Sequence, residues 1–348
     1  MIKRLFLTVL LFLLIIITGL HAADFEEDLQ KLVEENGKSY VQPLLTGFGT
    51  AVNSGLYKKA SVAPGKLIPI GFDIGVVTSA ALVPDEDKSF EYVMNVPITV
   101  GNESIDINYS DLYTSPSQTT PTIASDKEGT TLHRKSDEEI VSVVNSRLDE
   151  HQIEPEDIEQ VGIPESFSFP DGLNVQAVPY IALQANVRLP VVGIELTGRG
   201  FPEYEIKDVG KLSAYGVGLR KSLPVPVVDV TVGAFYQTMS IGDYFEVDNL
   251  NFHAEVGKSI GLPFLFNFSP YAGIGLDQTS GTLQYSLDTA ELPGEESDPE
   301  IKYDFEGENK LRFTAGFTAQ IIPLTYLNLE VAQGEYLSGT VSLGLIIK

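Results

Sequence analysis

Apolar and polar residues alternate along almost all of residues 174–348. In one run, Val228, Val230, Val232, Ala234 and Tyr236 alternate with Asp229, Thr231, Gly233 and Gln237. Such alternation gives each strand one apolar and one polar face, which is typical of antiparallel sheets. Several runs reach about nine residues, the length that a tilted strand needs to cross a membrane. We therefore predict an all-β fold of about ten to fourteen antiparallel strands, with about twelve as the best single value.

The alternation fits two architectures, a membrane barrel with its apolar face outward and a soluble β-sandwich with its apolar face inward. Three features favour an up-and-down transmembrane β-barrel. The predicted polar faces are rich in small residues such as Ala214, Gly216 and Gly218, the strands follow one another directly, and acidic stretches separate them as long loops would. Aromatic residues near the predicted strand ends are expected to form an interfacial girdle: Tyr180, Tyr236, Phe264, Phe266, Tyr271, Tyr326 and Tyr336. The soluble β-sandwich stays the alternative.

The first residues have the three-part pattern of a secretory signal peptide. Lys3 and Arg4 precede an apolar stretch over residues 5–18, and the chain becomes acidic from Asp24. We predict a signal peptide over residues 1–22, with cleavage near Ala22 or Ala23. An uncleaved anchor helix is the alternative, although the apolar stretch is short for a membrane span. Export predicts a location in the outer membrane, with the periplasm as the alternative.

The net charge of −25 is concentrated in three segments. Residues 24–36, 102–170 and 285–310 have net charges of −5, −11 and −7, so the β pattern lies in a nearly neutral remainder. The acidic balance excludes nucleic-acid binding through a basic surface. The chain has no cysteine, which excludes disulfide scaffolds, thiolate zinc sites and iron–sulfur clusters.

The regions before residue 174 differ from the regular β pattern. We predict an N-terminal helix and plug-like segment over residues 23–66, with an amphipathic helix over 25–36 that ends at Gly37 and a Gly-rich stretch over 39–57 that could enter a barrel lumen. Residues 67–348 are assigned to the barrel, with strand candidates at 68–83 and 90–100. An acidic helical insertion interrupts it over residues 101–172, with a capping box at Ser136 and Glu139 and a second short helix over 155–161.

The polar strand faces supply the candidate binding residues. We expect these side chains to line the lumen: Gln184, Asn186, Arg188, Glu195, Arg199, Asp229, His253, Glu255 and Arg312. An interior of mixed charge can set ion or solute preference, but the same side chains can also neutralise one another in a closed lumen. The Gly257–Gly261 stretch matches G-x-S-x-G, yet it lies at a strand end and His253 is about 20 Å away along the strand. No enzyme activity, metal site or cofactor is therefore expected.

Residues 169–229 carry a family resemblance. The stretch contains Pro170-x-Gly172-Leu173, Pro179 with Gln184-Ala185, Glu195-Leu196 with Arg199 and Pro202, Gly216-x-Gly218-x-Arg220-Lys221, and the run from Leu223 to Asp229. With the signal peptide and the acidic N-terminal helix, the chain resembles an uncharacterised bacterial family of outer-membrane β-barrel-like proteins, a domain of unknown function. It is more loosely similar to the long-chain fatty-acid transporter barrels, whose plug carries an Asn-Pro-Ala motif that this sequence lacks. The resemblance implies a barrel and no catalytic residues.

These observations predict an outer-membrane β-barrel that acts as a channel or transporter for small or hydrophobic solutes. Two alternatives stay open: a non-transporting barrel that displays the acidic insertion for partner binding, and a soluble periplasmic ligand-binding β protein. The expected partners are outer-membrane lipid, a small hydrophobic solute, and a protein partner at the 101–172 insertion.

Overall fold

The computed structural model describes residues 23–58, 70–94, 97–100, 103–105, 107–146, 165–206, 210–242, 245–262, 266–286, 300–307, 311–320 and 324–347. The chain divides into two compact units. The acidic unit comprises Met1–Pro43 and Asp85–Gln176, and the barrel unit comprises Leu44–Pro84 and Ala177–Lys348. The predicted signal peptide and the predicted helix over 155–161 lie outside the described residues.

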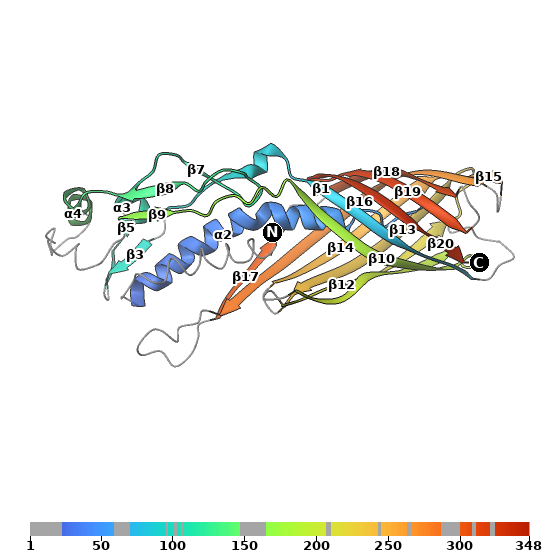
Figure 1. Cartoon of the computed structure of the whole chain (residues 1–348), viewed down its shortest axis with the longest axis horizontal. Coiled ribbons are helices and arrows are strands. Elements are labelled where there is room, and N and C mark those ends of the chain that lie inside the picture. Colours follow the sequence, from blue (N-terminus) through green and yellow to red (C-terminus); the bar gives the residue numbers. More distant parts are fainter. Residues whose placement is uncertain are drawn as a thin grey trace. The chain divides into compact units, whose positions relative to one another are not determined.

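The barrel unit is one antiparallel sheet that closes on itself. Its ring follows the chain order β1 (Gly71–Leu82), β10 (Ala177–Leu189), β11 (Ile194–Ile206), β12 (Gly210–Leu223), β13 (Asp229–Ile241), β14 (Phe245–Gly257), β16 (Phe266–Ser286), β18 (Leu311–Gln320), β19 (Thr325–Gln333) and β20 (Leu337–Ile347). The pairing of β1 with β20 closes the ring, and these two strands lie side by side in Figure 1. The structure thus confirms an up-and-down barrel rather than a sandwich.

The strand number depends on which strands are counted. The described sheet contains twelve strands, of which ten form the closed ring. Strands β15 (Ile260–Leu262) and β17 (Glu300–Glu306) pair with the two ends of the long strand β16 and so extend the positions of β14 and β18. Ten is the lower end of the predicted range, and twelve is its predicted best value.

The side-chain alternation has the direction expected of a membrane barrel. Outward residues such as Ile181, Val217 and Leu343 are 59–64% exposed, whereas polar residues on the opposite faces are buried inside. The outward position predicted for the aromatic residues of the girdle is correct for Tyr236 and Phe266, which are exposed on the outer face. It is wrong for Tyr180, Tyr271, Tyr326 and Tyr336, which are buried inside. Tyr180, Tyr271 and Tyr326 fall on the inward parity of their strands, Tyr336 lies in the turn between β19 and β20, and Phe264 lies outside the described residues.

Small inward residues make room for aromatic rings in the interior. A Cβ added at Gly218 would lie 1.9 Å from the ring of Phe235 on the neighbouring strand. A Cβ added at Gly75 would lie 2.3 Å from the hydroxyl oxygen of Tyr326. The small residues on the polar faces therefore do not widen an aqueous pore, because large side chains of adjacent strands occupy the space.

The acidic unit contains short elements of its own. It holds the first part of helix α2 (Ala23–Val52), η1 (Asp85–Lys88), α3 (Tyr109–Leu112) and α4 (Asp137–Asn145). Its described strands form three small sheets: β2 (Ser89–Glu91) with β7 (Thr119–Pro121), β3 (Pro97–Val100) with β4 (Glu103–Ile105) and β5 (Ile107–Asn108), and β8 (Thr131–Arg134) with β6 (Tyr113–Thr114) and β9 (Ser166–Ser168). None of the described helices is long and apolar enough to span a bilayer.

Local contacts explain the elements of the acidic unit. The predicted capping box forms, because the Ser136 backbone N–H donates to Glu139 Oε2 at 3.1 Å and the Glu139 N–H donates to Ser136 Oγ at 3.4 Å. Helix α2 does not end at Gly37 as predicted but continues to Val52. Beside Gly37, the Asn36 side-chain amide donates to the Val93 carbonyl at 3.0 Å and accepts from the Val93 N–H at 2.8 Å. Burial raises the pKa of the Tyr40 phenol, and its hydroxyl donates to the Asp171 carbonyl at 2.8 Å. The predicted strand over 90–100 divides between β2 and β3 and pairs only locally.

Candidate functional site: the filled barrel interior

Residues 44–58 occupy the lumen of the barrel. The segment consists of the last part of helix α2 and the turn that follows, and residues 45–58 are buried throughout. Phe48 meets Tyr180 edge to face with ring centroids 6.1 Å apart, and Leu56 and Tyr57 form one apolar cluster with Phe235 and Tyr271 of the wall. We call this segment the plug. It corresponds to most of the Gly-rich stretch that was expected to enter the lumen.

The end of helix α2 is held by an arginine from the wall. A helix terminus leaves carbonyl groups without partners and carries partial negative charge. The Arg199 guanidinium of β11 supplies the missing donors, with Nη1 at 2.8 Å from the Val52 carbonyl and 3.0 Å from the Ser54 carbonyl, and Nη2 at 2.7 Å from the Gly55 carbonyl. Its Nε donates to Gln184 Oε1 at 2.8 Å. The rigid guanidinium therefore fixes the plug and its own orientation at once.

A second arginine holds the same helix end from the other side. Arg312 of β18 donates to the Thr50 carbonyl at 2.6 Å and to Ser54 Oγ at 2.8 Å. Its Nε pairs with Asp277 Oδ2 at 2.8 Å, so the charge is compensated. Strands β11 and β18 are five steps apart in the ring of ten, which places the two arginines on opposite walls.

Glu330 of β19 binds the turn of the plug through its carboxylate. The Gly55 backbone N–H donates to Glu330 Oε1 at 2.7 Å, and the Tyr271 hydroxyl donates to Glu330 Oε2 at 2.9 Å. Gly55 has φ of +64°, a left-handed conformation that glycine adopts without strain. A Cβ at this position would also lie 2.6 Å from the Thr340 methyl carbon. The turn thus requires a glycine for both its backbone and its surroundings.

Ion pairs continue the network on one side of the plug. Lys58 Nζ lies 2.6 Å from Asp73 Oδ1, and Arg188 pairs with the same carboxylate. Arg188 Nε also lies 2.8 Å from Glu195 Oε2. Arg220 pairs with Glu195 and places Nη1 at 3.1 Å from both carboxylate oxygens of Glu255. One chain of alternating charges therefore links the plug to four strands, β1, β10, β11 and β12, and continues to β14.

His253 connects the ion-pair chain to the plug. Its ring contacts that of Tyr57 with centroids 4.2 Å apart and planes tilted by 57°, and its Nδ1 lies 2.7 Å from Asn251 Oδ1. Its Nε2 lies 3.6 Å from Glu255 Oε1. The Tyr57 hydroxyl donates to the same Asn251 oxygen at 3.1 Å. The histidine is therefore packed against the plug as part of the barrel wall that contacts it.

The interior charges balance. Among the described residues, five cationic side chains lie in the interior, namely Lys58, Arg188, Arg199, Arg220 and Arg312. Five anionic side chains face them: Asp73, Glu195, Glu255, Asp277 and Glu330. Buried charges persist when they have partners that satisfy them. Eight of these ten groups form the ion pairs described above, whereas Arg199 and Glu330 are held by the hydrogen bonds described above.

The structure brings together eight of the nine candidate residues predicted from sequence. Gln184, Asn186, Arg188, Glu195, Arg199, His253, Glu255 and Arg312 all belong to this interior. Asp229 is half-buried at the start of β13 and takes no part in the bonds described above. The prediction missed Lys58, Asp73, Arg220, Asp277 and Glu330. Strand parity could have identified Arg220 and Glu330, since both lie on inward positions of alternating runs.

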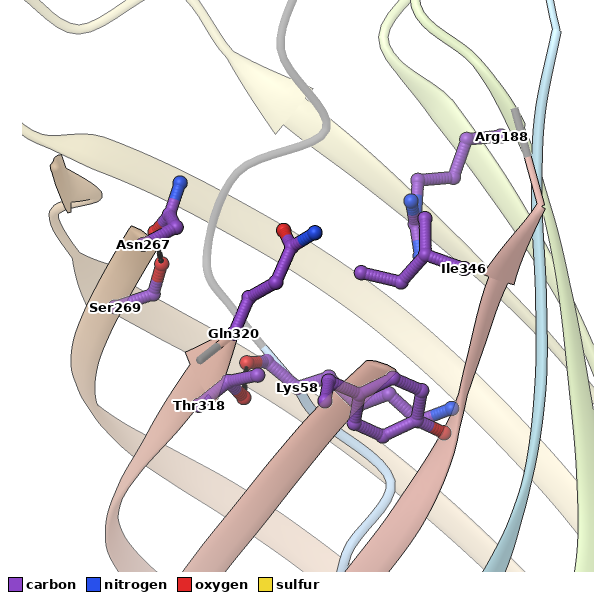
Figure 2. A pocket seen from close by; sticks show the side chains of 8 residues that line it. Lys58, Arg188, Asn267, Ser269, Thr318, Gln320 and Ile346 are labelled. Atoms are coloured by element: carbon purple, nitrogen blue, oxygen red, sulfur yellow. Dashed lines mark hydrogen bonds between the residues drawn. The ribbon is translucent and has the colours of Figure 1, made fainter. Parts of the chain in front are cut away.

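Described residues of the barrel unit line a small hollow and a larger one. The one drawn in Figure 2 has a volume of about 30 Å³ and lies among Lys58, Arg188, Thr318 and Tyr326. This volume suits water-sized occupants. A hollow of about 650 Å³ lies at the polar part of the β14–β16 wall, beside Asp248, Gln278 and Glu306. Within the described ranges, no three acidic or histidine side chains are grouped as a metal site would require.

The chain was compared with protein families, curated proteins and solved structures. The family described as "Family of unknown function (DUF6588)" matches residues 1–347. No curated protein matches the chain. Similar solved structures include the outer membrane protease OmpT from Escherichia coli, with a TM-score of 0.30 and 9% identity, covering 82% of this chain and 97% of that one. The N-terminal β-barrel domain of Pseudomonas aeruginosa OprF has a TM-score of 0.22 and 12% identity, covering 44% of this chain and 96% of that one. The attachment invasion locus protein Ail of Yersinia pestis has a TM-score of 0.21 and 8% identity, covering 79% of this chain and 94% of that one.

Proposed function

Because the chain belongs to the DUF6588 family of unknown function, we propose its function from the barrel itself. The protein is an outer-membrane β-barrel that its own plug keeps closed, and it anchors the acidic unit in the membrane instead of conducting solutes. The single observation that carries this proposal is the capture of the α2 helix end by Arg199 and Arg312 from opposite walls.

The outer surface supports the membrane location. Exposed apolar residues continue around the ring, with Leu183 on β10, Val217 on β12, Ile274 on β16 and Leu343 on β20 each 47–64% exposed. Soluble proteins rarely expose apolar patches of this extent, whereas a barrel in lipid presents such a band. The export pattern of the first residues agrees with transfer to the outer membrane.

The interior supports the closed state. Moving the plug would remove the wall donors of the Val52, Ser54 and Gly55 carbonyls and would leave Arg199 and Arg312 without their plug acceptors. A buried polar group that loses its partner costs about 1–3 kcal/mol, so several such losses together make opening rare. A channel or transporter for small or hydrophobic solutes, which the sequence predicts, would require the plug to shift. The anchoring role needs no such movement.

Conductance measurements test the proposal. Purified full-length protein, refolded in detergent and shown to be barrel-folded by its heat-modifiable gel mobility, is added to planar lipid bilayers. We expect no sustained unitary conductance from the wild-type protein. A parallel sample of an open porin controls for insertion. Stable, reproducible channel steps from the wild type would contradict the closed barrel and favour a channel.

A further inference from the structure

We infer that the N-terminal segment is threaded outward through the lumen, so that residues 23–43 and 85–176 both face the outside of the cell. This inference rests on the proposed membrane location. The barrel has two ends, which we name by their connections. The short-turn end holds Gly71, where β1 begins, and Ile347, where β20 ends; the long-connection end holds Leu82 and Ala177.

The plug has a fixed direction within the barrel. Near the long-connection end, a Cβ added at Gly47 would lie 2.4 Å from a methyl carbon of Val178, the second residue of β10, and 3.5 Å from the Tyr336 ring. At the other end of the plug, Lys58 pairs with Asp73, the third residue of β1. The segment therefore runs from the long-connection end toward the short-turn end as residue numbers rise.

Intermediate contacts give the same direction. The Ser79 hydroxyl, near the long-connection end of β1, donates to the Ala51 carbonyl at 2.6 Å. The ammonium group of Lys58 lies 4.5 Å from the ring centroid of Tyr326, the second residue of β19, which begins at the short-turn end. Leu44 therefore lies on the long-connection side, and the chain preceding it leaves the barrel there. Pro84 and Ala177, which lead into and out of the insertion, lie at this same end.

The connection lengths assign the ends to the two sides of the membrane. At the short-turn end, residues 190–193, 224–228 and 321–324 join neighbouring strands. Residues 207–209, 242–244 and 334–336 make equally short connections at the opposite end, which is distinguished by its two longer ones. At the long-connection end, residues 83–176 join β1 to β10 and residues 287–299 join β16 to β17. Outer-membrane barrels have short periplasmic turns and long extracellular loops, so the long-connection end faces outward.

The outer surface has a matching polarity. On β14, Glu246 near the long-connection end is exposed and polar, whereas Phe252 and Val256 toward the short-turn end are exposed and apolar. On β16, the exposed Gln278 and Ser280 toward the long-connection end are polar, whereas the exposed Leu276 and Ile274 toward the short-turn end are apolar. On these two strands, polar wall thus extends beyond the apolar residues at the end that we assign to the outside.

Site-specific labelling tests the threading, because the chain has no cysteine of its own. Four full-length single-cysteine variants are produced in a Gram-negative host: Glu26→Cys, Asp28→Cys, Glu128→Cys and Val227→Cys. The first two positions belong to the first part of helix α2. Glu128 is exposed in the insertion, and Val227 is 82% exposed in the turn between β12 and β13. The reagent is a maleimide on a polymer too large to pass the outer membrane.

We expect intact cells to be labelled at Glu128→Cys and at one or both α2 positions, and Val227→Cys to be labelled only after the outer membrane is permeabilised. Labelling of both α2 variants only after permeabilisation would overturn the threading, and so would an absence of label at both positions before and after it. Labelling of Val227→Cys in intact cells would show the reverse orientation. If the wild type shows channel steps but the labelling pattern is as expected, the proposed closed state is contradicted and the threading is supported.

Discussion

Replacing Arg220 by alanine is expected to lower the free energy of unfolding by about 3–5 kcal/mol, the cost of removing one partner from a buried charge network. Arg220 is 4% exposed and pairs with Glu195 and with both carboxylate oxygens of Glu255. Its loss leaves Glu255 with only the more distant His253 among the contacts described above. Urea unfolding of the detergent-solubilised protein, followed by heat-modifiable gel mobility, measures the change.

Two further variants distinguish the network from a general effect of losing a cation. Lys211→Ala removes an exposed cation that pairs with Glu203 at 2.7 Å, and we expect a change below about 1 kcal/mol. The double variant Arg220→Met, Glu255→Gln removes one charge of each sign, and it should regain most of the lost stability, because Glu195 keeps its pair with Arg188 and Glu255 no longer carries an unpaired charge. A double variant no more stable than Arg220→Ala would contradict this explanation.

Removing both plug-holding arginines is expected to open the barrel. In Arg199→Ala the Ser54 and Gly55 carbonyls lose their wall donor, at about 1–3 kcal/mol for each buried carbonyl, or about 2–6 kcal/mol together. Arg312→Ala removes the donors to Thr50 and Ser54 from the opposite wall. With both changes, we expect unitary conductance steps in planar bilayers where the wild type shows none.

The matched control keeps the same chemistry on the surface. The exposed Lys221 donates to the Val192 carbonyl, so Lys221→Ala also removes a cation from a backbone carbonyl. We expect this variant to have the stability of the wild type and, like the wild type, to show no conductance steps. If the double arginine variant folds and conducts no more than Lys221→Ala, the two arginines do not keep the plug in place.

Strand parity was sufficient to predict the fold and most of the residues that face the interior. A period of two fixes which side of the wall each residue faces, so Gln184, Glu195 and Arg199 could be placed inside without any knowledge of their partners. The same rule, applied to Tyr180 and Tyr271, would have moved them from the girdle to the interior. That error came from judging these tyrosines by their position near strand ends instead of by parity.

Long-range partners could not be predicted from the sequence. Lys58 and Asp73 are near in sequence, but Arg188 meets Asp73 only because β1 pairs with β10 across the insertion. The contacts of Thr50 and Gly55 with Arg312 and Arg199 depend on a helix end that enters a closed ring. Neither event leaves a local sequence signal, because both are consequences of ring closure.

The most direct test of the plugged barrel is a disulfide between the plug and the wall. A Cβ at Gly47 would lie 3.0 Å from Val178 Cβ, close to the roughly 3.5–4.5 Å that a disulfide spans. In the cysteine-free chain, Gly47→Cys with Val178→Cys is predicted to form an intramolecular disulfide in the oxidising cell envelope, seen as a mobility change that a reductant reverses. The control pair Gly198→Cys with Val178→Cys should stay reduced, because a Cβ at Gly198 meets no atom within 4 Å. Free thiols at positions 47 and 178 in a correctly folded barrel would contradict the plug.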